Sequence, residues 1–474
     1  MEDARGHAEE NGPSAARRTI VVARDLGEVW LALLEDGRVV ELTVRPVGQG
    51  RLLGAILKGR VSRVASGVHA AFVAIGQARD AFVPLDDDRE PPREGDEVLL
   101  QVVREAQGAK GPRATFDVTL PGWALVLAPR RAQCGVSRKI VDQVERERLR
   151  ALVEELAPEG FGLVARTAAT GLGRDELRAE RDELLARWNG IAARAAESRP
   201  PTLVHREDDP GVVFVRDHLA GGLEAIVVDG EAEEFARRLG ERGEAARVAP
   251  HVGPLPAVEA YGLEQAARLA LAAEAPLPGG GWLALQSTEA LTAIDVNSGA
   301  DTSAANLEET ALRTNLEAAE EIPRQLRLRD VGGLVVVDFI DMDAAADRAK
   351  VNAAFAAALS RDRAKLRVLP LTDFHLAQIT RERRRLPLEK ILGEPCPCCR
   401  RGVVLRPEAA ARDLLREARR RARPLPRARI VLEAPETVAA AGREILELWG
   451  EASGFDRTRP VVWRVGERSV RIES

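Results

Sequence analysis

Two aspartates each end a short apolar segment, and carboxylates in that position can hold a divalent cation. Asp295 ends the run that begins at Leu291, with Asn297 two residues further on, and Asp338 ends the run that begins at Gly332. Side chains two apart on a strand share a face, and neighbouring carboxylates repel unless a cation lies between them. Magnesium prefers oxygen ligands of this kind, so the pattern predicts a magnesium site held by Asp295 and Asp338.

Magnesium next to a phosphate polarises phosphorus and activates a water molecule. The predicted chemistry is therefore metal-assisted hydrolysis of a phosphate ester, with Asn297 as a ligand or as a group that orients a carboxylate. Asp341, just after the second run, is a weaker candidate for outer support of the metal. The residues alone leave open a simpler alternative, in which each aspartate only caps its strand.

A second chemical motif is the cysteine cluster Cys396-Pro-Cys-Cys399. Cys396 and Cys399 have the spacing at which two thiolates bind one zinc ion, and a structural zinc site requires four ligands. The chain contains no second Cys-x-x-Cys pair, so we expect the motif of a second chain to complete the site across a two-fold axis. A redox pair and an isolated turn are the alternatives, and the pattern assigns no role to Cys398.

Short strands separated by turns between residues 56 and 104 predict a small five-stranded barrel. Such barrels bind single strands by stacking bases on exposed aromatic side chains next to basic ones. Aromatic residues make up only 4% of the chain, so Phe72 and Phe82 stand out as candidates, and burial of both in the core is the alternative. Downstream, Arg166-Thr167 ends another predicted strand, where the two side chains can hold a phosphate or form a surface ion pair.

The composition indicates an ordinary soluble chain with several domains. Of the 474 residues, 45% are hydrophobic and 30% are charged, and the formal net charge is only −5. No stretch approaches the roughly 18 apolar residues of a membrane span. Residues 1–18 lack the apolar core of a signal peptide, so we expect a cytoplasmic protein. Residues 400–429 contain eleven arginines and three acidic residues, which indicates a nucleic-acid contact or a solvated helix face.

Longer motifs make the chain similar to a known family. They are Ser287-Thr-Glu-Ala-Leu-Thr-Ala-Ile-Asp-Val-Asn-Ser298, Glu308-Glu-Thr-Ala, Thr314-Asn-Leu-Glu-Ala-Ala, Arg324-Gln-Leu-Arg-Leu-Arg-Asp330 and Val337-Asp-Phe-Ile-Asp-Met342. With Lys58-Gly-Arg-Val and the Cys-Pro-x-Cys knuckle, they make the chain resemble the bacterial ribonuclease E/G family from about Ile20 onward. It looks most like the short form of the family, which lacks a disordered C-terminal scaffold, so we expect no degradosome scaffold.

The resemblance implies an α+β multidomain fold, in which an RNase-H-like fold is interrupted by an S1-type OB barrel and a 5′ sensor. A DNase-I-like catalytic subdomain, a zinc link and a small C-terminal α/β domain follow. The implied boundaries are a disordered N-terminus at 1–18, the RNase-H-like subdomain at 19–50 and 212–277, the barrel at 51–112, the 5′ sensor at 113–211, the catalytic subdomain at 278–393, the zinc link at 394–403 and the last domain at 404–474.

The resemblance also implies a magnesium-dependent, single-strand-specific endoribonuclease that leaves 5′-phosphate and 3′-hydroxyl ends and prefers 5′-monophosphorylated RNA. Asp295 and Asp338 match the magnesium ligands, with Asn297 beside them. Other matching positions are Phe72, Phe82, Lys110 and Lys365 for RNA binding, and Arg166, Thr167, Gly122, Val126 and Arg138 for the 5′-phosphate pocket. The implied partners are ribosomal RNA precursors, messenger RNA and a second copy of the chain, held by one zinc per dimer, with tetramers as the larger alternative.

Another interpretation keeps the fold without the chemistry, as a non-catalytic RNA-binding or ribosome-assembly factor. A phosphatase acting on small molecules is disfavoured by the RNA-type barrel. The chain has no Gly-x(4)-Gly-Lys-Ser/Thr loop, which argues against nucleotide hydrolysis.

Overall fold

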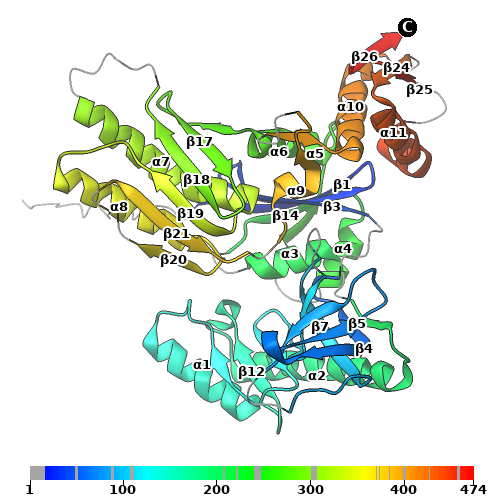
Figure 1. Cartoon of the computed structure of the whole chain (residues 1–474), viewed down its shortest axis with the longest axis vertical. Helices are drawn as coiled ribbons and strands as arrows, with labels where there is room; N and C mark the ends of the chain where they lie inside the picture. The colour runs from blue at the N-terminus through cyan, green and yellow to red at the C-terminus, as the bar shows by residue number, and fades with distance from the viewer. Residues whose placement is uncertain are drawn as a thin grey trace, which may run out of the picture. The chain divides into compact units, whose positions relative to one another are not determined.

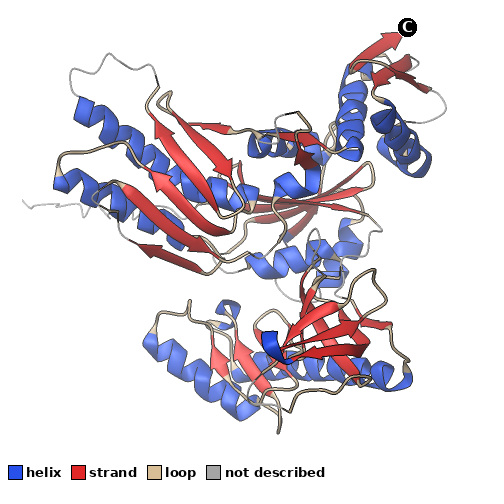
Figure 2. Ribbon diagram, in the orientation of Figure 1, coloured by secondary structure: helices blue, strands red, loops and turns tan. Residues whose placement is uncertain are grey.

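The computed structural model describes most of the chain after residue 15. The described residues are 16–47, 52–86, 90–106, 111–206, 209–219, 222–239, 247–299, 307–369, 371–372, 374–383, 385–398, 402–425, 428–455 and 460–473. The chain forms two compact units, one from residues 1–47 and 223–474 and one from residues 48–222. Figure 1 labels their helices and strands, and Figure 2 shows that both units mix helices with strands.

The first unit begins with a five-stranded sheet in the order β15-β14-β1-β2-β3. The strands are β1 (Arg18–Asp25), β2 (Glu28–Glu35), β3 (Arg38–Pro46), β14 (Ala225–Val228) and β15 (Val248–Pro250). The first three form an antiparallel meander, and β14 and β15 add to it in parallel. The apolar helix faces packed on this sheet belong to α5 (Ala257–Ala260), α6 (Leu263–Leu271) and α9 (Leu388–Leu392), while α4 (Ala232–Leu239) follows β14.

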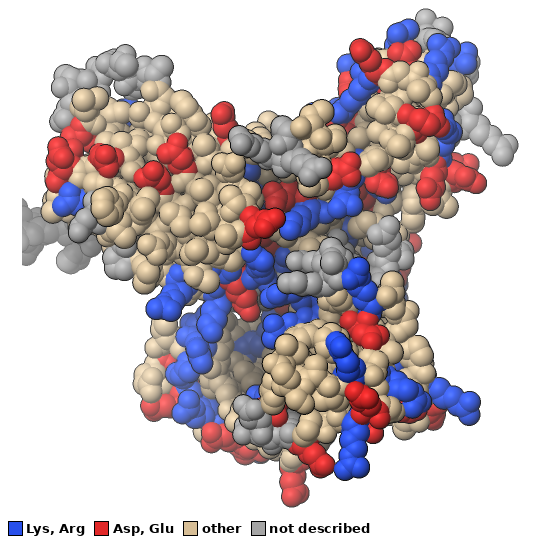
Figure 3. Space-filling model, viewed as in Figure 1, with Lys and Arg blue, Asp and Glu red and all other residues tan. Residues whose placement is uncertain are grey.

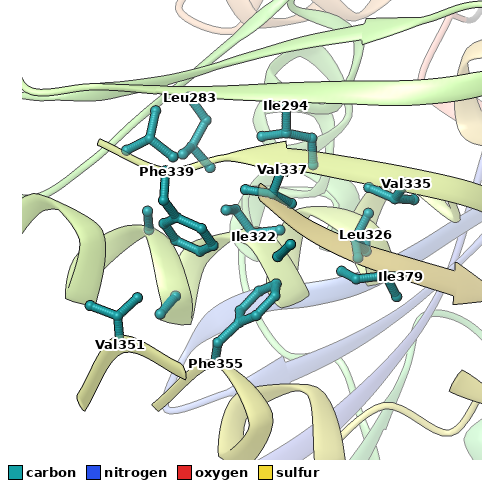
Figure 4. Packing of buried hydrophobic residues seen from close by; sticks show 14 of the residues in the cluster. Leu283, Ile294, Ile322, Leu326, Val335, Val337, Phe339, Val351, Phe355 and Ile379 are labelled. Atoms are coloured by element: carbon teal, nitrogen blue, oxygen red, sulfur yellow. The ribbon is translucent and has the colours of Figure 1, made fainter. Parts of the chain in front are cut away.

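A second sheet in the same unit has the order β16-β17-β18-β19-β21-β20. Its strands are β16 (Glu274–Pro276), β17 (Trp282–Ser287), β18 (Leu291–Asn297), β19 (Gly333–Asp338), β20 (Leu366–Leu369) and β21 (Leu376–Arg381). Alternate residues of β18 and β19 are buried, as expected for half-buried strands. The buried face packs on α7 (Leu307–Arg329) and α8 (Ala345–Ser360), with Phe339 and Phe355 in edge contact between them (Figure 4).

The first unit ends with a hairpin and a three-stranded sheet flanked by two helices. The hairpin is β22 (Gly393–Pro395) with β23 (Val403–Leu405), and the sheet order is β25-β24-β26. The remaining elements are α10 (Pro407–Ala422), β24 (Arg429–Ala434), α11 (Glu436–Trp449), β25 (Val461–Val465) and β26 (Ser469–Glu473). None of the described helices of either unit is long and apolar enough to cross a membrane.

The unit of residues 48–222 contains the predicted barrel. Its strands are β4 (Ile56–Ala65), β5 (Ala70–Ala74), β6 (Ala81–Pro84), β7 (Glu97–Arg104) and β8 (Arg113–Thr115), and the pairing of β4 with β7 closes it. This closed five-stranded, OB-like barrel confirms the prediction of a mixed α+β protein with a small barrel. A further strand, β13 (Thr202–His205), pairs with the outside edge of β4.

The rest of this unit is a small sheet in the order β11-β12-β10-β9 with three helices. The strands are β9 (Leu120–Pro121), β10 (Leu125–Ala128), β11 (Gly135–Val136) and β12 (Gly162–Ala165), and the helices are α1 (Gln143–Leu156), α2 (Arg174–Glu197) and α3 (Pro210–His218). Figure 3 shows many Lys and Arg side chains on the visible face of this unit, with acidic side chains among them. The barrel and the small sheet have separate apolar cores.

The arginine-rich segment that begins near residue 400 packs against the first sheet, whereas the sequence favoured a nucleic-acid contact or a solvated face. Arg416 of α10 is 5% exposed, donates to Asp25 at 2.7 Å and to Glu28 at 2.8 Å, and lies over the ring of Trp30. Arg419 also pairs with Asp25, at 2.7 Å. The arginines of α10 therefore join this helix to the sheet, because they form ion pairs with acidic residues of β1 and β2 that are distant in sequence.

Burial alone would raise the pKa of Asp25, but Arg416 and Arg419 hold it below the usual value. A carboxyl with a depressed pKa in the folded state stabilises the fold above the pKa of the unfolded chain, and this contribution is lost as pH falls through the folded pKa. The cluster thus supports the fold at neutral pH and weakens in acid.

We predict that Arg416→Met lowers the free energy of unfolding by about 3–5 kcal/mol, because it removes the buried cation that bonds to both Asp25 and Glu28. Urea unfolding at neutral pH measures the change. The control is Arg443→Met, whose partner Glu436 is 60% exposed; this loss should stay below about 1 kcal/mol. Equal losses in the two variants would contradict the assigned role of the cluster.

Candidate active site

Asp295 and Asp338 are direct neighbours on adjacent strands. β18 and β19 pair in parallel, with Ile294 opposite Val337 and Asp295 opposite Asp338. Backbones of paired strands lie about 4.8 Å apart. The isoleucine and the valine are buried in the core, whereas both aspartates are on the exposed face of the sheet. The two predicted carboxylates are thus brought together on a surface open to solvent.

The charges around Asp338 are mainly negative. Partial burial and the charges of Asp295 and Asp341 raise the pKa of Asp338, and His375 opposes them. Asn297 donates from Nδ2 to Oδ2 of Asp295 at 2.9 Å. The amide therefore orients one carboxylate of the pair, which is one of the two roles expected for Asn297.

The turn after β19 is fixed by hydrogen bonds from α7. Asn315, which is fully buried, donates to the carbonyl of Ile340 at 2.8 Å and accepts from its N–H at 3.0 Å. Near the start of the same helix, the carboxylate of Glu308 accepts from the N–H groups of Asp343 and Ala344. The helix thereby fixes the backbone that carries Asp338 and Asp341.

His375 holds the same turn from the side of β21. Its Nδ1 is 2.8 Å from Oδ1 of Asp341. Its Nε2 is 3.1 Å from the carbonyl oxygen and 3.3 Å from the nitrogen of Met342. His375 also has a positive φ of 57°, a conformation uncommon for residues other than glycine and one that clusters at functional sites.

The donors present fit a magnesium ion better than a metal that needs many protein ligands. Within the described ranges, no group of three or more His, Cys, Asp or Glu side chains is arranged to hold a metal. Magnesium keeps several waters and binds through one or two carboxylates together with substrate phosphates. Asp295 and Asp338 would hold it, and Asn297 would orient the first of them.

Lys365 lies away from the carboxylate pair. Leu376, at the start of β21, is opposite Asp338. The carbonyl of Lys365 accepts from Glu382, just past the other end of β21. The side chain of Lys365 is exposed there, so any RNA contact that it makes is remote from the carboxylate pair.

On the barrel, Phe72 and Phe82 point outward. They alternate with buried alanines and valines, are partly exposed, and lie opposite each other on β5 and β6 with ring centroids 5.8 Å apart. Arg63 is paired with Phe72 in register and lies 4.5 Å from its ring centroid, and Arg113 is the register partner of Phe82. Two basic residues thus flank two aromatic ones in a row that crosses β4, β5, β6 and β8. Lys110 lies outside the described residues.

The residues of the predicted 5′-phosphate pocket lie around the ends of β10 and β12. Arg166 donates to the carbonyl of Gly122 at 2.5 Å and pairs with Asp217 of α3 at 3.0 Å. The hydroxyl of Thr167 is 3.4 Å from that of Ser137. The structure thus places Arg166 beside Gly122 and Thr167 beside Ser137. Arg138 follows Ser137 in the chain, and Val126 is paired with Val164 on β12.

Gly122 is required by the backbone turn at this pocket. The buried carboxylate of Glu180 accepts from the N–H groups of Ala124 at 2.9 Å and Leu125 at 3.2 Å. A Cβ at position 122 would lie 2.2 Å from Oε1 of Glu180. Any side chain at this position would therefore displace the carboxylate that fixes the turn.

The cysteine cluster lies in the turn between β22 and β23. Cys396 is half-buried and its N–H donates to the carbonyl of Gly402 at 2.8 Å, which closes the turn. Cys396 and Cys398 are free thiols, and Cys399 lies outside the described residues. The shared zinc site stays a prediction.

Two residues of the site escaped interpretation from the sequence. Asn315 occurred only within a longer motif, and His375 counted as one of several scattered histidines. A signal for His375 existed, because it directly precedes an apolar run that pairs with the run ending at Asp338. No local pattern identified Asn315, since its partner Ile340 is 25 positions away.

The fold and this site define a mixed α+β protein with an OB-like barrel and a carboxylate pair on an open sheet. A profile of the Ribonuclease E/G family matches residues 119–384. Ribonuclease G of Haemophilus influenzae is 35% identical over 417 residues, which cover 82% of this chain and 84% of that protein. Ribonuclease E of Escherichia coli is 35% identical over 425 residues, which cover 84% of this chain and 40% of that protein. The chain belongs to the ribonuclease E/G family.

We predict that Asp295→Asn lowers the pKa of Asp338 in the metal-free protein, because it removes the nearest repelling charge. A carboxyl with a raised pKa stabilises the fold below the unfolded pKa and loses that contribution as pH rises through the folded pKa. The variant should therefore be more stable than the wild type at pH 7 and not at pH 3.

Carbon-13 NMR of the aspartate carboxyls, followed by urea unfolding at both pH values, measures these changes. Asp341→Asn is the matched variant, and its effect on Asp338 should be smaller, because the charge of Asp341 has the weaker influence. An unchanged titration of Asp338 in Asp295→Asn would contradict the proximity of the two carboxylates.

Proposed function

We propose that this protein is a magnesium-dependent endoribonuclease that hydrolyses single-stranded RNA to 5′-phosphate and 3′-hydroxyl ends. Its family makes it an endoribonuclease of RNA processing. The observation that carries the metal dependence is the in-register pairing of Asp295 with Asp338 on an exposed sheet face. We further propose that it acts in the cytoplasm, on ribosomal RNA precursors and messenger RNA.

The carboxylate pair would hold magnesium, which supplies an activated water and neutralises charge that develops on the phosphate. Asn297 keeps Asp295 oriented, and α7 keeps the turn after Asp338 in place through Asn315. Attack by water accounts for the proposed ends. A cyclic phosphate requires instead an acid–base pair that activates the ribose hydroxyl, and the ring nitrogens of His375 are already bonded to Asp341 and Met342.

The barrel would hold the RNA strand by stacking and charge together. Aromatic side chains stack on bases without strong sequence preference, and the outward position of Phe72 and Phe82 suits this role. Arg63 and Arg113 flank them and can bind phosphates. Because phosphate contacts release counterions, the affinity should fall steeply with salt. Lys110 and Lys365 remain proposed RNA contacts.

The pocket around Arg166 would bind a 5′-monophosphate. A guanidinium and a hydroxyl on adjacent residues match phosphate oxygens well, and Gly122 gives the turn its close approach to Glu180. Asp217 now pairs with Arg166. A bound phosphate would either displace the carboxylate of Asp217 from the guanidinium of Arg166 or bind to the guanidinium together with it.

The subdomain assignments follow the same proposal. The sheet of β1–β3 with β14 and β15 would be the RNase-H-like part, the small sheet of β9–β12 the 5′ sensor, and the sheet of β16–β21 the DNase-I-like part. Cys396 and Cys399 would hold one zinc ion with the same cysteines of a second copy, giving a homodimer that can pair further. The family motifs and the hairpin turn at Cys396 support this assembly.

Cleavage of a labelled single-stranded RNA tests the catalytic proposal. We predict that magnesium supports cutting, EDTA abolishes it, and Asp295→Asn or Asp338→Asn lowers kcat by about hundredfold or more, since a lost metal ligand removes several kcal/mol of transition-state stabilisation. Asn297→Ala should lose about 10–100-fold. The matched control is Asp347→Asn, whose carboxylate lies on α8 and pairs with the exposed Lys350; this variant should retain activity.

End analysis of the products separates the mechanisms, because a cyclic phosphate would contradict attack by water. Unchanged cutting by Asp295→Asn would reject the metal assignment. RNA binding without cutting by the wild type under any divalent ion would favour the alternative, a non-catalytic RNA-binding or ribosome-assembly factor.

For the pocket, we predict that Arg166→Ala removes the preference for 5′-monophosphorylated over 5′-hydroxyl RNA and leaves cutting of the 5′-hydroxyl substrate unchanged. Rates on the two substrates, compared at equal concentration, measure the preference. Arg174→Ala is the control, because Arg174 is an exposed arginine of the same unit that pairs with Glu155. A preference that survives Arg166→Ala would place the phosphate elsewhere.

A further inference from the structure

An aromatic side chain is left exposed beside the carboxylate pair. Phe374 is 82% exposed, and in the described part of the chain it is the one aromatic residue among the large, well-exposed apolar side chains. Leaving a phenylalanine in water forfeits most of the free energy that its burial would contribute. In a chain with only 10 phenylalanines, such exposure indicates that the ring contacts a ligand.

The register of the sheet places this residue next to the site. Leu376 pairs with Asp338, and the N–H of Phe339 donates to the carbonyl of His375 at 3.3 Å. Phe374 therefore directly precedes the residue whose backbone meets the turn after Asp338. No other element separates the two segments.

The backbone that presents Phe374 is held firmly. The N–H of His375 donates to the carbonyl of Thr372 at 3.0 Å, and the N–H of Leu376 donates to the hydroxyl of Thr372 at 3.2 Å. His375 then bonds to Asp341 and Met342 through its ring. An exposed ring on a backbone fixed in this way is preorganised for contact, because little conformational entropy remains to be lost.

The local charge indicates what the ring contacts. Asp295, Asp338 and Asp341 make this surface negative, so without a bound cation it repels a phosphodiester backbone. The same sheet carries further exposed apolar side chains, Leu334 at the other end of β19 and Leu369 on β20. Apart from a cation held by the carboxylates, attraction to RNA at this place comes from the faces of the bases, on which an aromatic ring stacks.

We propose that Phe374 stacks on the base of a nucleotide next to the scissile phosphate and thereby helps to select the position of cleavage. This inference rests on the proposed endoribonuclease function and assigns it a specificity-determining residue. The partner is a nucleobase of the single-stranded RNA substrate, and the stack fixes the adjoining phosphate at the carboxylate pair. His375 and Thr372 hold the ring in place.

The test compares Phe374→Ala, Phe374→Leu and Phe374→Trp on an RNA with one main cleavage site. In matched RNAs, each nucleotide near that site is replaced in turn by an abasic ribose. We expect Phe374→Ala to lower kcat/KM by about tenfold and to spread the cuts over neighbouring positions. Phe374→Trp should restore both, while Phe374→Leu should not, because it keeps apolar bulk without an aromatic face.

The abasic substrates identify the base. At one position, loss of the base should reduce wild-type cutting and leave Phe374→Ala unaffected, since the stacking partner is already absent. Leu448→Ala, at a 65% exposed apolar position on α11, is the control for surface truncation and should match the wild type. Circular dichroism confirms that each variant is folded.

Three outcomes would overturn the proposal: an unchanged cleavage map in Phe374→Ala, full rescue by Phe374→Leu, or equal sensitivity to every abasic substitution in wild type and variant. These outcomes differ from failure of the proposed function, in which the wild type itself would not cut the RNA.

Discussion

The structure of the site depends on one repulsive contact, the placement of two carboxylates at the same level of adjacent parallel strands. Their register is fixed on the other face of the sheet, where Ile294 and Val337 are buried against α7 and α8. A slip of one residue in either strand would move its aspartate into that core and its apolar side chain into water. Apolar packing thus holds two like charges together, and the open face lets a cation or solvent offset their repulsion.

Several of the buried carboxylates of the protein, in contrast, have cationic partners. Arg381, which is 5% exposed, pairs with Asp362 at 2.8 Å and with Asp330 at 2.9 Å, at the end of β21 remote from the site. Arg416 does the same for Asp25 and Glu28. Across the described residues, neither Asp295 nor Asp338 pairs with a lysine or arginine, although the chain has 69 such residues. The site differs from the rest of the fold by lacking a built-in countercharge.

Much of this organisation could be predicted from the sequence, because the informative patterns are local. Short strand-like runs separated by turns predicted the barrel, and short apolar runs predicted the two strands that carry the aspartates. The outward position of Phe72 and Phe82 could not be decided from the residues alone, because the pattern along a strand does not say which of its two faces meets the core. The roles of Asn315 and Arg416 could not be predicted from the residues around them in the sequence. Their partners lie 25 and 391 positions away, and only the folded chain brings them together.

The order of the chain has a consequence for its synthesis on the ribosome. The parallel neighbours β1 and β14 are paired in register, Val21 with Val227, yet the whole unit of residues 48–222 lies between them in the sequence. The meander of β1–β3 must therefore emerge with an unpaired edge, and it stays so while that unit is translated. Since open strand edges invite intermolecular pairing and incomplete domains aggregate, the nascent chain is most exposed to aggregation during this interval.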